Sequence, residues 1–290
     1  MITASSSPRF SRLAKCVGFT ALLTMTSAVQ AAEQRIISTD AGSTDILLAL
    51  DKGADLVGVD VTSVIPPQLK AAKLGYHRML ATEGVLSLNP NMVVGSEHMG
   101  PAETVAAIKK ANIALLQLPA ARDAKSLKEN IVKISAFVHS EQQAKPLLQR
   151  IDQSMAKVAE HQLPPNSKVA FLLQMDGKGL RLAGQGTTGD DFIHLLGGES
   201  LGAHRGYQSV SAEALLSLQP DVIIVASRDM SRSPVAMLLE ATPLLKHTPA
   251  GTQQRIVAVD GRQLVSGISL EAMDALVDVS AALNAAKPAS

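Results

Sequence analysis

The sequence has no tryptophan, only two tyrosines and a single cysteine among its 290 residues. The tyrosines are Tyr76 and Tyr207, and the cysteine is Cys16. One cysteine cannot form an internal disulfide, so a disulfide framework is excluded. Apolar residues make up 46% of the chain, which is enough for a hydrophobic core, and the length suits two domains of ordinary size.

Several motifs of enzymes and nucleotide-binding proteins are also missing. The chain contains no GxSxG, no HExxH and no clear pair of catalytic acids. The segment Gly184–Gly189 is rich in glycine but lacks the P-loop lysine, so we interpret it as a tight turn with a Thr or Asp helix cap. The histidines form no HxH or HxxxH pair, which argues against a zinc carrier. We therefore do not expect an enzyme.

The first 31 residues have the pattern of a secretory signal peptide. Basic residues come first, and the apolar run Val17–Val29 is too short to span a bilayer comfortably. We expect cleavage after Ala31. Cys16 precedes the apolar run and follows a lysine, so we do not expect a lipoprotein. The mature chain would carry 24 basic and 26 acidic residues, a balance that does not favour nucleic acid or an anionic membrane as partner.

One stretch occurs twice in the chain. Glu83–Pro90 reads EGVLSLNP, and Glu213–Pro220 reads EALLSLQP. Each copy precedes an apolar run that is typical of a strand. A second pair of similar runs begins at Asp45 and at Asp191. These echoes predict two similar lobes with a binding cleft between them.

Short apolar strands alternate with helical patterns in both halves, which predicts an α/β fold with parallel sheets in two lobes. Between them, residues 124–162 contain no glycine and show apolar residues at three- and four-residue spacing, which predicts two successive helices. We expect an N-terminal lobe over 32–140, a long linking helix over 141–163 and a C-terminal lobe over 164–290. The expected strands are Arg35–Ser38, Leu56–Val61, Met92–Val94, Ile113–Leu118, Val169–Gln174, Val222–Ala226 and Arg255–Val259.

The segment that begins at Gly75 places Tyr76, His77 and Arg78 side by side. A tyrosine phenolate is a known axial ligand of haem iron. A nearby cation favours the ionised phenol, and in an extended segment Arg78 would lie on the same side as Tyr76 while His77 points away. The alternative is that Tyr76 packs at a lobe edge and Arg78 is an ordinary surface charge.

Glu83 and Glu213 hold matching places at the start of two predicted helices. An acidic residue in a first helical turn is favoured by the helix dipole, which is the simpler explanation. The alternative is that two exposed carboxylates at equivalent places engage basic sites on a two-fold symmetric partner.

A few more polar residues could meet a ligand. His98 ends the strand that follows the Tyr76 segment. Arg181, Arg205 and Arg228 follow predicted strands or lie in loops of the second lobe, where each could bind a ligand carboxylate.

With these residues in hand, the chain resembles the periplasmic haem-binding components of bacterial haemin ABC importers. They belong to the cobalamin and siderophore class of substrate-binding proteins. The resemblance covers essentially the whole mature chain. It is most specific in GYHRMLATEGVLSLNP from Gly75, DDFIHLLGG from Asp190 and GYQSVSAEALLSLQPDVIIV from Gly206.

The resemblance implies two α/β lobes joined by a rigid helix. Haem would lie in the cleft as transported ligand, not as a catalytic cofactor. Tyr76 matches the iron-ligating tyrosine and Arg78 the cation that assists it. Glu83 and Glu213 match the acids presented to arginines of the inner-membrane permease dimer. An outer-membrane haem uptake system would act upstream, and the carrier itself would be periplasmic.

The sequence departs from the pattern at one point. Some members add a histidine ligand from the first strand of the second lobe, but Phe171–Met175 contains none. Tyr76 would then be the single protein ligand, or a second contact would come from Met175, His98 or a movable group; His77 is the neighbouring candidate. The alternative functions are a siderophore or cobalamin carrier, a chelatase-like tetrapyrrole enzyme, and a haem scavenger that docks no permease.

Overall fold

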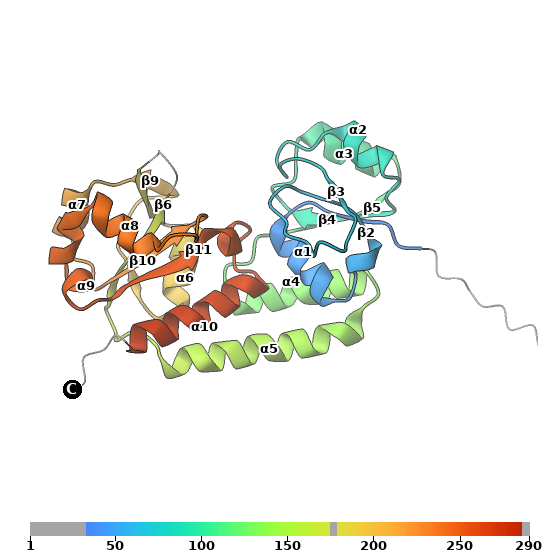
Figure 1. Cartoon of the computed structure of the whole chain (residues 1–290). Coiled ribbons are helices and arrows are strands. Elements are labelled where there is room, and N and C mark those ends of the chain that lie inside the picture. Colours follow the sequence, from blue (N-terminus) through green and yellow to red (C-terminus); the bar gives the residue numbers. More distant parts are fainter. Residues whose placement is uncertain (1–32, 175–178, 286–290) are drawn as a thin grey trace, which may run out of the picture. The chain divides into compact units, whose positions relative to one another are not determined.

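Two β-sheets flanked by helices make up the part of the chain that the computed structural model describes, residues 33–174 and 179–285 (Figure 1). The expected signal peptide, Cys16 and Met175 lie outside the described residues. Residues from Gln34 onward belong to a single unit. The α/β class with two sheets is confirmed.

The first sheet is parallel throughout, with the strand order β3-β2-β1-β4-β5. Its strands are β1 (Ile36–Ser38), β2 (Leu56–Val59), β3 (Ala72–Lys73), β4 (Met92–Ser96) and β5 (Ala114–Leu118). The helices among them are α1 (Ala41–Ala49), η1 (Gly53–Asp55), α2 (Thr82–Ser87) and α3 (Ala102–Lys110). The Tyr76 segment follows β3, beyond the carboxyl ends of the strands. In open parallel sheets this is the edge where ligands bind.

The second sheet is mixed, which differs from the parallel sheet expected here. Its order is β11-β10-β6-β7-β9, with β8 beside β6, and β7 pairs antiparallel with both of its neighbours. The connection from Gln174 to Leu180 is too short for the crossover that a parallel pair needs. The strands are β6 (Lys168–Gln174), β7 (Leu180–Ala183), β8 (Glu199–Ser200), β9 (Tyr207–Ser209), β10 (Val222–Ser227) and β11 (Ile256–Asp260).

Helices of the second half begin at side-chain caps that the sequence supplies. Thr187 accepts a hydrogen bond from the Asp190 amide at the start of α6, so the predicted Thr cap after the glycine-rich turn is confirmed. The helical segments are α6 (Thr188–Leu195), α7 (Ala212–Leu218), α8 (Pro234–Ala241), η2 (Pro243–His247), α9 (Pro249–Thr252), η3 (Gly261–Leu264) and α10 (Leu270–Ala285).

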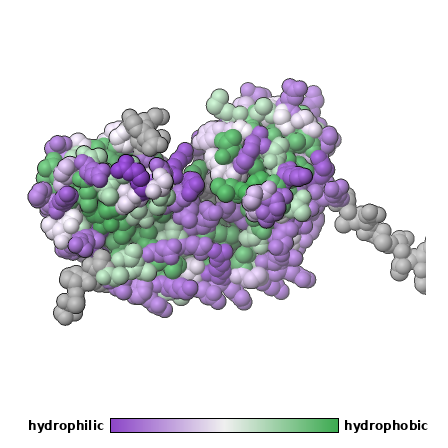
Figure 2. All heavy atoms as spheres, in the orientation of Figure 1, coloured by the Kyte–Doolittle hydropathy of each residue, from purple (hydrophilic) through white to green (hydrophobic). Residues whose placement is uncertain are grey.

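Two successive helices join the sheets, as the spacing of apolar residues predicted. They are α4 (Ala124–Phe137) and α5 (Glu141–Glu160). Helix α5 buries Leu147, Ile151 and Val158 on one stripe and packs against α4 and α10. Its outward side is hydrophilic (Figure 2), which is the division expected of an amphipathic surface helix.

Helix α1 begins at Ala41, so Gly42–Thr44, a triplet with the composition of a turn, lies inside its first turns. The carboxylate of Asp40 accepts a hydrogen bond from the Ser43 amide at 2.9 Å and so caps the first turn. The cap stabilises the early start even though a glycine falls inside the helix.

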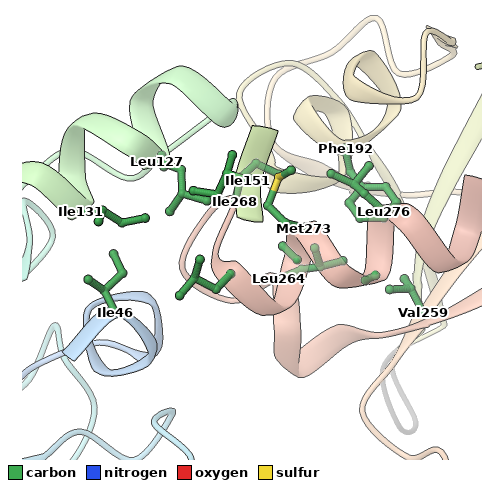
Figure 3. Packing of buried hydrophobic residues seen from close by; sticks show 14 of the residues in the cluster. Ile46, Leu127, Ile131, Ile151, Phe192, Val259, Leu264, Ile268, Met273 and Leu276 are labelled. Atoms are coloured by element: carbon green, nitrogen blue, oxygen red, sulfur yellow. The ribbon is translucent and has the colours of Figure 1, made fainter. Parts of the chain in front are cut away.

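One of the hydrophobic clusters contains residues of both sheets and of the helices packed on them. It includes Ile46 of α1, Leu127 of α4, Ile151 of α5, Phe192 of α6 and Leu276 of α10 (Figure 3). Close-packed interiors transmit displacement and deform little. Among the described residues no helix combines the length and apolarity needed to cross a membrane.

Candidate functional site

The Tyr76 segment is a turn fixed by its own backbone. Gly75 adopts a φ of 90°, a conformation that side chains rarely allow. The Tyr76 carbonyl then accepts a hydrogen bond from the Met79 amide at 2.8 Å. The His77 carbonyl accepts one from the Gly100 amide at 2.9 Å. These bonds hold the backbone that carries the predicted iron ligand.

Tyr76 and Arg78 both reach solvent from this turn. The Tyr76 residue is 44% exposed, and Arg78 is exposed as well. Within the described residues, the Arg78 guanidinium has no hydrogen bond or ion pair, and none joins it to the Tyr76 hydroxyl. Both side chains are therefore free to meet a ligand.

His77 points the opposite way, as predicted for the middle residue of this triplet. Its side chain is 8% exposed, and Nδ1 lies 3.5 Å from Oδ2 of the fully buried Asp60. Its ring centroid lies 4.1 Å from that of Tyr76, with the ring planes tilted by 45°. His77 is thus turned toward Asp60, and direct contact with iron stays a prediction.

Asp60 is itself held by several donors. Its carboxylate accepts hydrogen bonds from the Ser63 hydroxyl at 2.6 Å, the Ser63 amide at 3.0 Å and the Thr62 hydroxyl at 2.7 Å. Burial raises the pKa of Asp60, but His77 and the Ser63 and Thr62 donors outweigh burial and hold that pKa below its ordinary value. The carboxylate behind His77 is therefore a stable negative charge.

Two cavities meet at Tyr76. The larger, of about 430 Å³, is lined by apolar side chains such as Leu173 and by polar ones such as Gln174, and Arg228 is the single charged side chain among its described lining residues. The smaller, of about 280 Å³, is polar. Its lining includes Arg78, His98, Glu97, Arg122 and Asp191. Ligand sites typically combine apolar walls with polar groups that fix the ligand's orientation, and the larger cavity offers both.

The other predicted residues divide between these cavities and the remaining surface. His98 is exposed and lines the smaller cavity, and Arg228 is exposed and lines the larger one. Arg205 is exposed but lines neither cavity. Arg181 donates to the Tyr207 carbonyl at 2.6 Å, which occupies it structurally.

Two residues of the site were missed from the sequence. Tyr207 lines the larger cavity with Tyr76. Its hydroxyl accepts a hydrogen bond from the Gly189 amide at 3.3 Å, and burial raises its pKa. Arg122 donates three hydrogen bonds to Asp191, at 2.7 to 3.1 Å, across the smaller cavity. The scarcity of tyrosine was a signal for Tyr207, but no local pattern pointed to Arg122.

Glu83 and Glu213 occupy equivalent places in the two halves. Each lies exposed in the first turn of its helix, α2 or α7. The next turns bury Val85 and Leu215 respectively. The amide of Glu213 and the Ser211 hydroxyl lower the pKa of the Glu213 carboxyl, so it stays charged. In the described ranges, no cluster of three or more His, Cys, Asp or Glu could hold a metal ion by itself.

Comparison with known families gives a match over most of the chain. A family model described as "Periplasmic binding protein" matches residues 36–262. Two curated relatives share less sequence with this chain than the solved structures described next. The uncharacterized ABC transporter substrate-binding lipoprotein YvrC of Bacillus subtilis is 22% identical over 66% of this chain, and the match spans 63% of its own length. The vitamin B12-binding protein of Pectobacterium atrosepticum is 22% identical over 70% of this chain and 75% of its own.

Solved structures with the same fold are more similar. The periplasmic haem-binding protein HutB of Vibrio cholerae is 32% identical, with a TM-score of 0.78, and covers 87% of this chain and 99% of its own. A periplasmic haem-binding protein from Pseudomonas aeruginosa is also 32% identical, with a TM-score of 0.75, over 89% and 95%. The periplasmic haem-binding protein BhuT, solved with two haems, is 26% identical, with a TM-score of 0.76, over 87% and 98%.

Proposed function

Because the chain belongs to the periplasmic binding protein family, a non-catalytic component of transport, we propose that it captures ferric haem and delivers it to an inner-membrane ABC importer. Haem is the transported ligand. The proposal includes export through a signal peptide cleaved after Ala31, without a lipid anchor. It also includes the division into an N-terminal lobe (32–140), a linking helix (141–163) and a C-terminal lobe (164–290).

The observation that carries this proposal is the exposed phenol of Tyr76 in the lining of a cavity that combines apolar and polar side chains. Phenolate oxygen is a known axial ligand of haem iron. A porphyrin is a large apolar ring, so contact with the partly exposed side chains of Leu173, Val265 and Tyr207 in this cavity is favourable. The similarity to several haem-binding proteins at about 30% identity points the same way.

Arg78 assists Tyr76 in this proposal. A guanidinium two residues away would stabilise the negative charge of a phenolate oxygen that binds iron. Arg78 has no other partner among the described residues, so it is available for that role. The iron then has one protein ligand from Tyr76, with His98 as the second candidate because it lies in the adjoining cavity.

Delivery requires the iron ligand to be displaced. The hydrophobic cluster shared by α1, α5, α6 and α10 favours small movements over a wide hinge opening. We propose that the permease binds the exposed carboxylates of Glu83 and Glu213, one from each lobe, and that release follows from a shift of the Tyr76 turn.

A haemin titration of the mature protein tests the proposal, with Tyr76→Phe and Tyr207→Phe compared. We expect a saturable absorbance change in the parent with a tyrosinate-to-iron band. Tyr76→Phe should lose that band and weaken binding by about tenfold or more, since a charged ligand bond is lost. Tyr207→Phe removes the other phenol of the same cavity and should keep the band.

Other outcomes redirect the proposal. No saturable change in the parent would overturn haem as ligand, and titration with cyanocobalamin and ferric siderophores would then test the same fold with its other known substrate classes. Equal spectra in the parent and Tyr76→Phe would keep haem but remove Tyr76 from the iron.

A further inference from the structure

We propose that His77 is a positioning residue for Tyr76, and that Asp60 holds it in place. The imidazole, backed by the buried carboxylate, would fix the tyrosine ring in the orientation that presents its oxygen to the ligand. The inference rests on the proposed function, because the ligand that it concerns is the one that Tyr76 would bind.

The first argument is the burial of a polar ring between two exposed neighbours. Tyr76 and Arg78 face solvent, whereas the His77 side chain is 8% exposed. A buried imidazole is unfavourable unless a polar partner faces it. The polar group that faces it is Asp60, whose side chain is fully buried and whose Oδ2 lies 3.5 Å from His77 Nδ1, an electrostatic contact rather than a hydrogen bond.

The second argument is that Asp60 cannot follow His77 if the histidine moves. Three hydrogen bonds from Ser63 and Thr62 fix its carboxylate, and its amide donates to the Ser38 carbonyl of β1 at 3.1 Å. The Ser63 hydroxyl continues to that of Thr44 at 2.7 Å. The network ties Asp60 to the first sheet and to α1, so His77 packs against a rigid base.

The third argument is the ring contact itself. The centroids of Tyr76 and His77 are 4.1 Å apart, closer than the roughly 4.5 Å at which favourable aromatic pairs usually begin, so the histidine ring lies directly against the tyrosine ring. An exposed tyrosine without such a support would lose rotational freedom only when it binds its ligand. A ring held beforehand avoids that loss, and preorganised groups bind more tightly for this reason.

The simpler alternative is that His77 only fills space under the turn. Leucine would fill similar space without the ring or the polar contact, and phenylalanine would keep a flat ring beside Tyr76 but lose Asp60. Asp60→Asn keeps an acceptor and removes the charge. These variants separate ring support from packing.

Tyrosine fluorescence offers a direct test without ligand, because the sequence has no tryptophan and only two tyrosines. In a Tyr207→Phe background Tyr76 is the only such fluorophore. We expect His77→Leu to lower the fluorescence anisotropy and raise acrylamide quenching of Tyr76, and His77→Phe to restore much of both. Unchanged anisotropy in His77→Leu would overturn the proposal whatever the ligand is.

Haemin binding supplies the second test. His77→Leu should weaken binding about two- to tenfold and shift or broaden the tyrosinate band, with a smaller effect in His77→Phe and an intermediate effect in Asp60→Asn. In a Tyr76→Phe background, His77→Leu should cost no further affinity. An equal cost in that background would show that His77 acts through the fold or on the ligand directly, and would overturn the proposal.

The two tests also keep this inference apart from the proposed function. A parent protein that binds no haemin, with Tyr76 anisotropy that still depends on His77, would overturn the haem proposal and retain the positioning role. If the parent shows a tyrosinate band and His77→Leu changes neither the band nor the affinity for haemin, the haem proposal would stand and the positioning role would be overturned.

Discussion

At the scale of single residues, Arg228 has the surroundings of a carboxylate receptor. It follows β10 and is the single charge among the described residues that line the larger cavity. The neighbouring carboxylates are already engaged: Asp229, next in sequence, accepts from the Ser231 amide, and Asp260, which pairs with Ser227 across the sheet, accepts from Arg262. Arg122, by contrast, already donates to Asp191 from Nε and Nη2.

We therefore predict that Arg228 distinguishes charged from esterified propionates. In Arg228→Gln, the preference for haemin over its dimethyl ester should fall by about tenfold, because a charge-assisted hydrogen bond contributes roughly 1.5–3 kcal/mol. Arg205→Gln is the matched control, since Arg205 is exposed but lines neither cavity. Equal weakening of both ligands by Arg228→Gln would contradict the prediction.

At the scale of elements, helices α2 and α7 present the same face to solvent. Residues 81–90 and 211–220 have nearly the same sequence of buried and exposed positions. In both, an acid is exposed in the first turn and a proline is buried after the helix. The likeness supports a role that needs two equivalent contacts.

Reversing these two charges should uncouple binding from delivery. We expect Glu83→Lys with Glu213→Lys to leave the haemin titration unchanged. Uptake through the partner importer in proteoliposomes should fall by about tenfold or more, because like charges across an interface repel. Glu103→Lys is the control, since Glu103 is an exposed acid in the first turn of α3. Unchanged uptake in the double variant would favour a haem scavenger.

The elements also show what sequence reasoning could and could not reach. Strands such as β10 are buried along their whole length, so their apolar runs are easy to recognise. Strands β3, β7, β8 and β9 are only two to four residues long and give no periodic signal. The start of α1 depends on the Asp40 side chain, which caps the first turn. This cap outweighs the turn-like Gly42–Thr44 triplet that follows it.

The residues of the site also fall into those that the sequence could indicate and those that it could not. Tyr76, Arg78 and Arg228 were predicted because they belong to a local motif or follow a strand. The Arg122–Asp191 pair joins residues 69 positions apart, and the Asp60–His77 contact joins two separate loops. Such contacts arise from the packing of elements, which no local spacing encodes.

At the scale of the whole molecule, an acidic pair lies between α1 and α10. Burial, followed by the charges of Glu271 and Asp40, raises the pKa of Asp45 to about 8. An unfolded Asp ionises near pH 4. Between these values the folded protein binds a proton that the unfolded chain releases, so stability falls as pH rises from about 4 to about 8.

Asp45→Asn should remove this loss of stability with rising pH. We expect the free energy of unfolding of the ligand-free parent to fall by about 1–3 kcal/mol between pH 5 and pH 8.5 through this group, allowing for its partial exposure. The variant should show a flatter profile and greater stability at pH 8.5 by urea unfolding. Asp278→Asn, an exposed position on α10, is the control. Parallel profiles for the parent and Asp45→Asn would contradict the prediction.

Helix α10 packs against α1 and α5. Its Met273 and Leu276 belong to the same cluster as Ile46 of α1 and Ile151 of α5 (Figure 3). The cluster is therefore complete only when α10 is in place, so a chain cut before residue 270 would leave the apolar faces of α1 and α5 open to solvent.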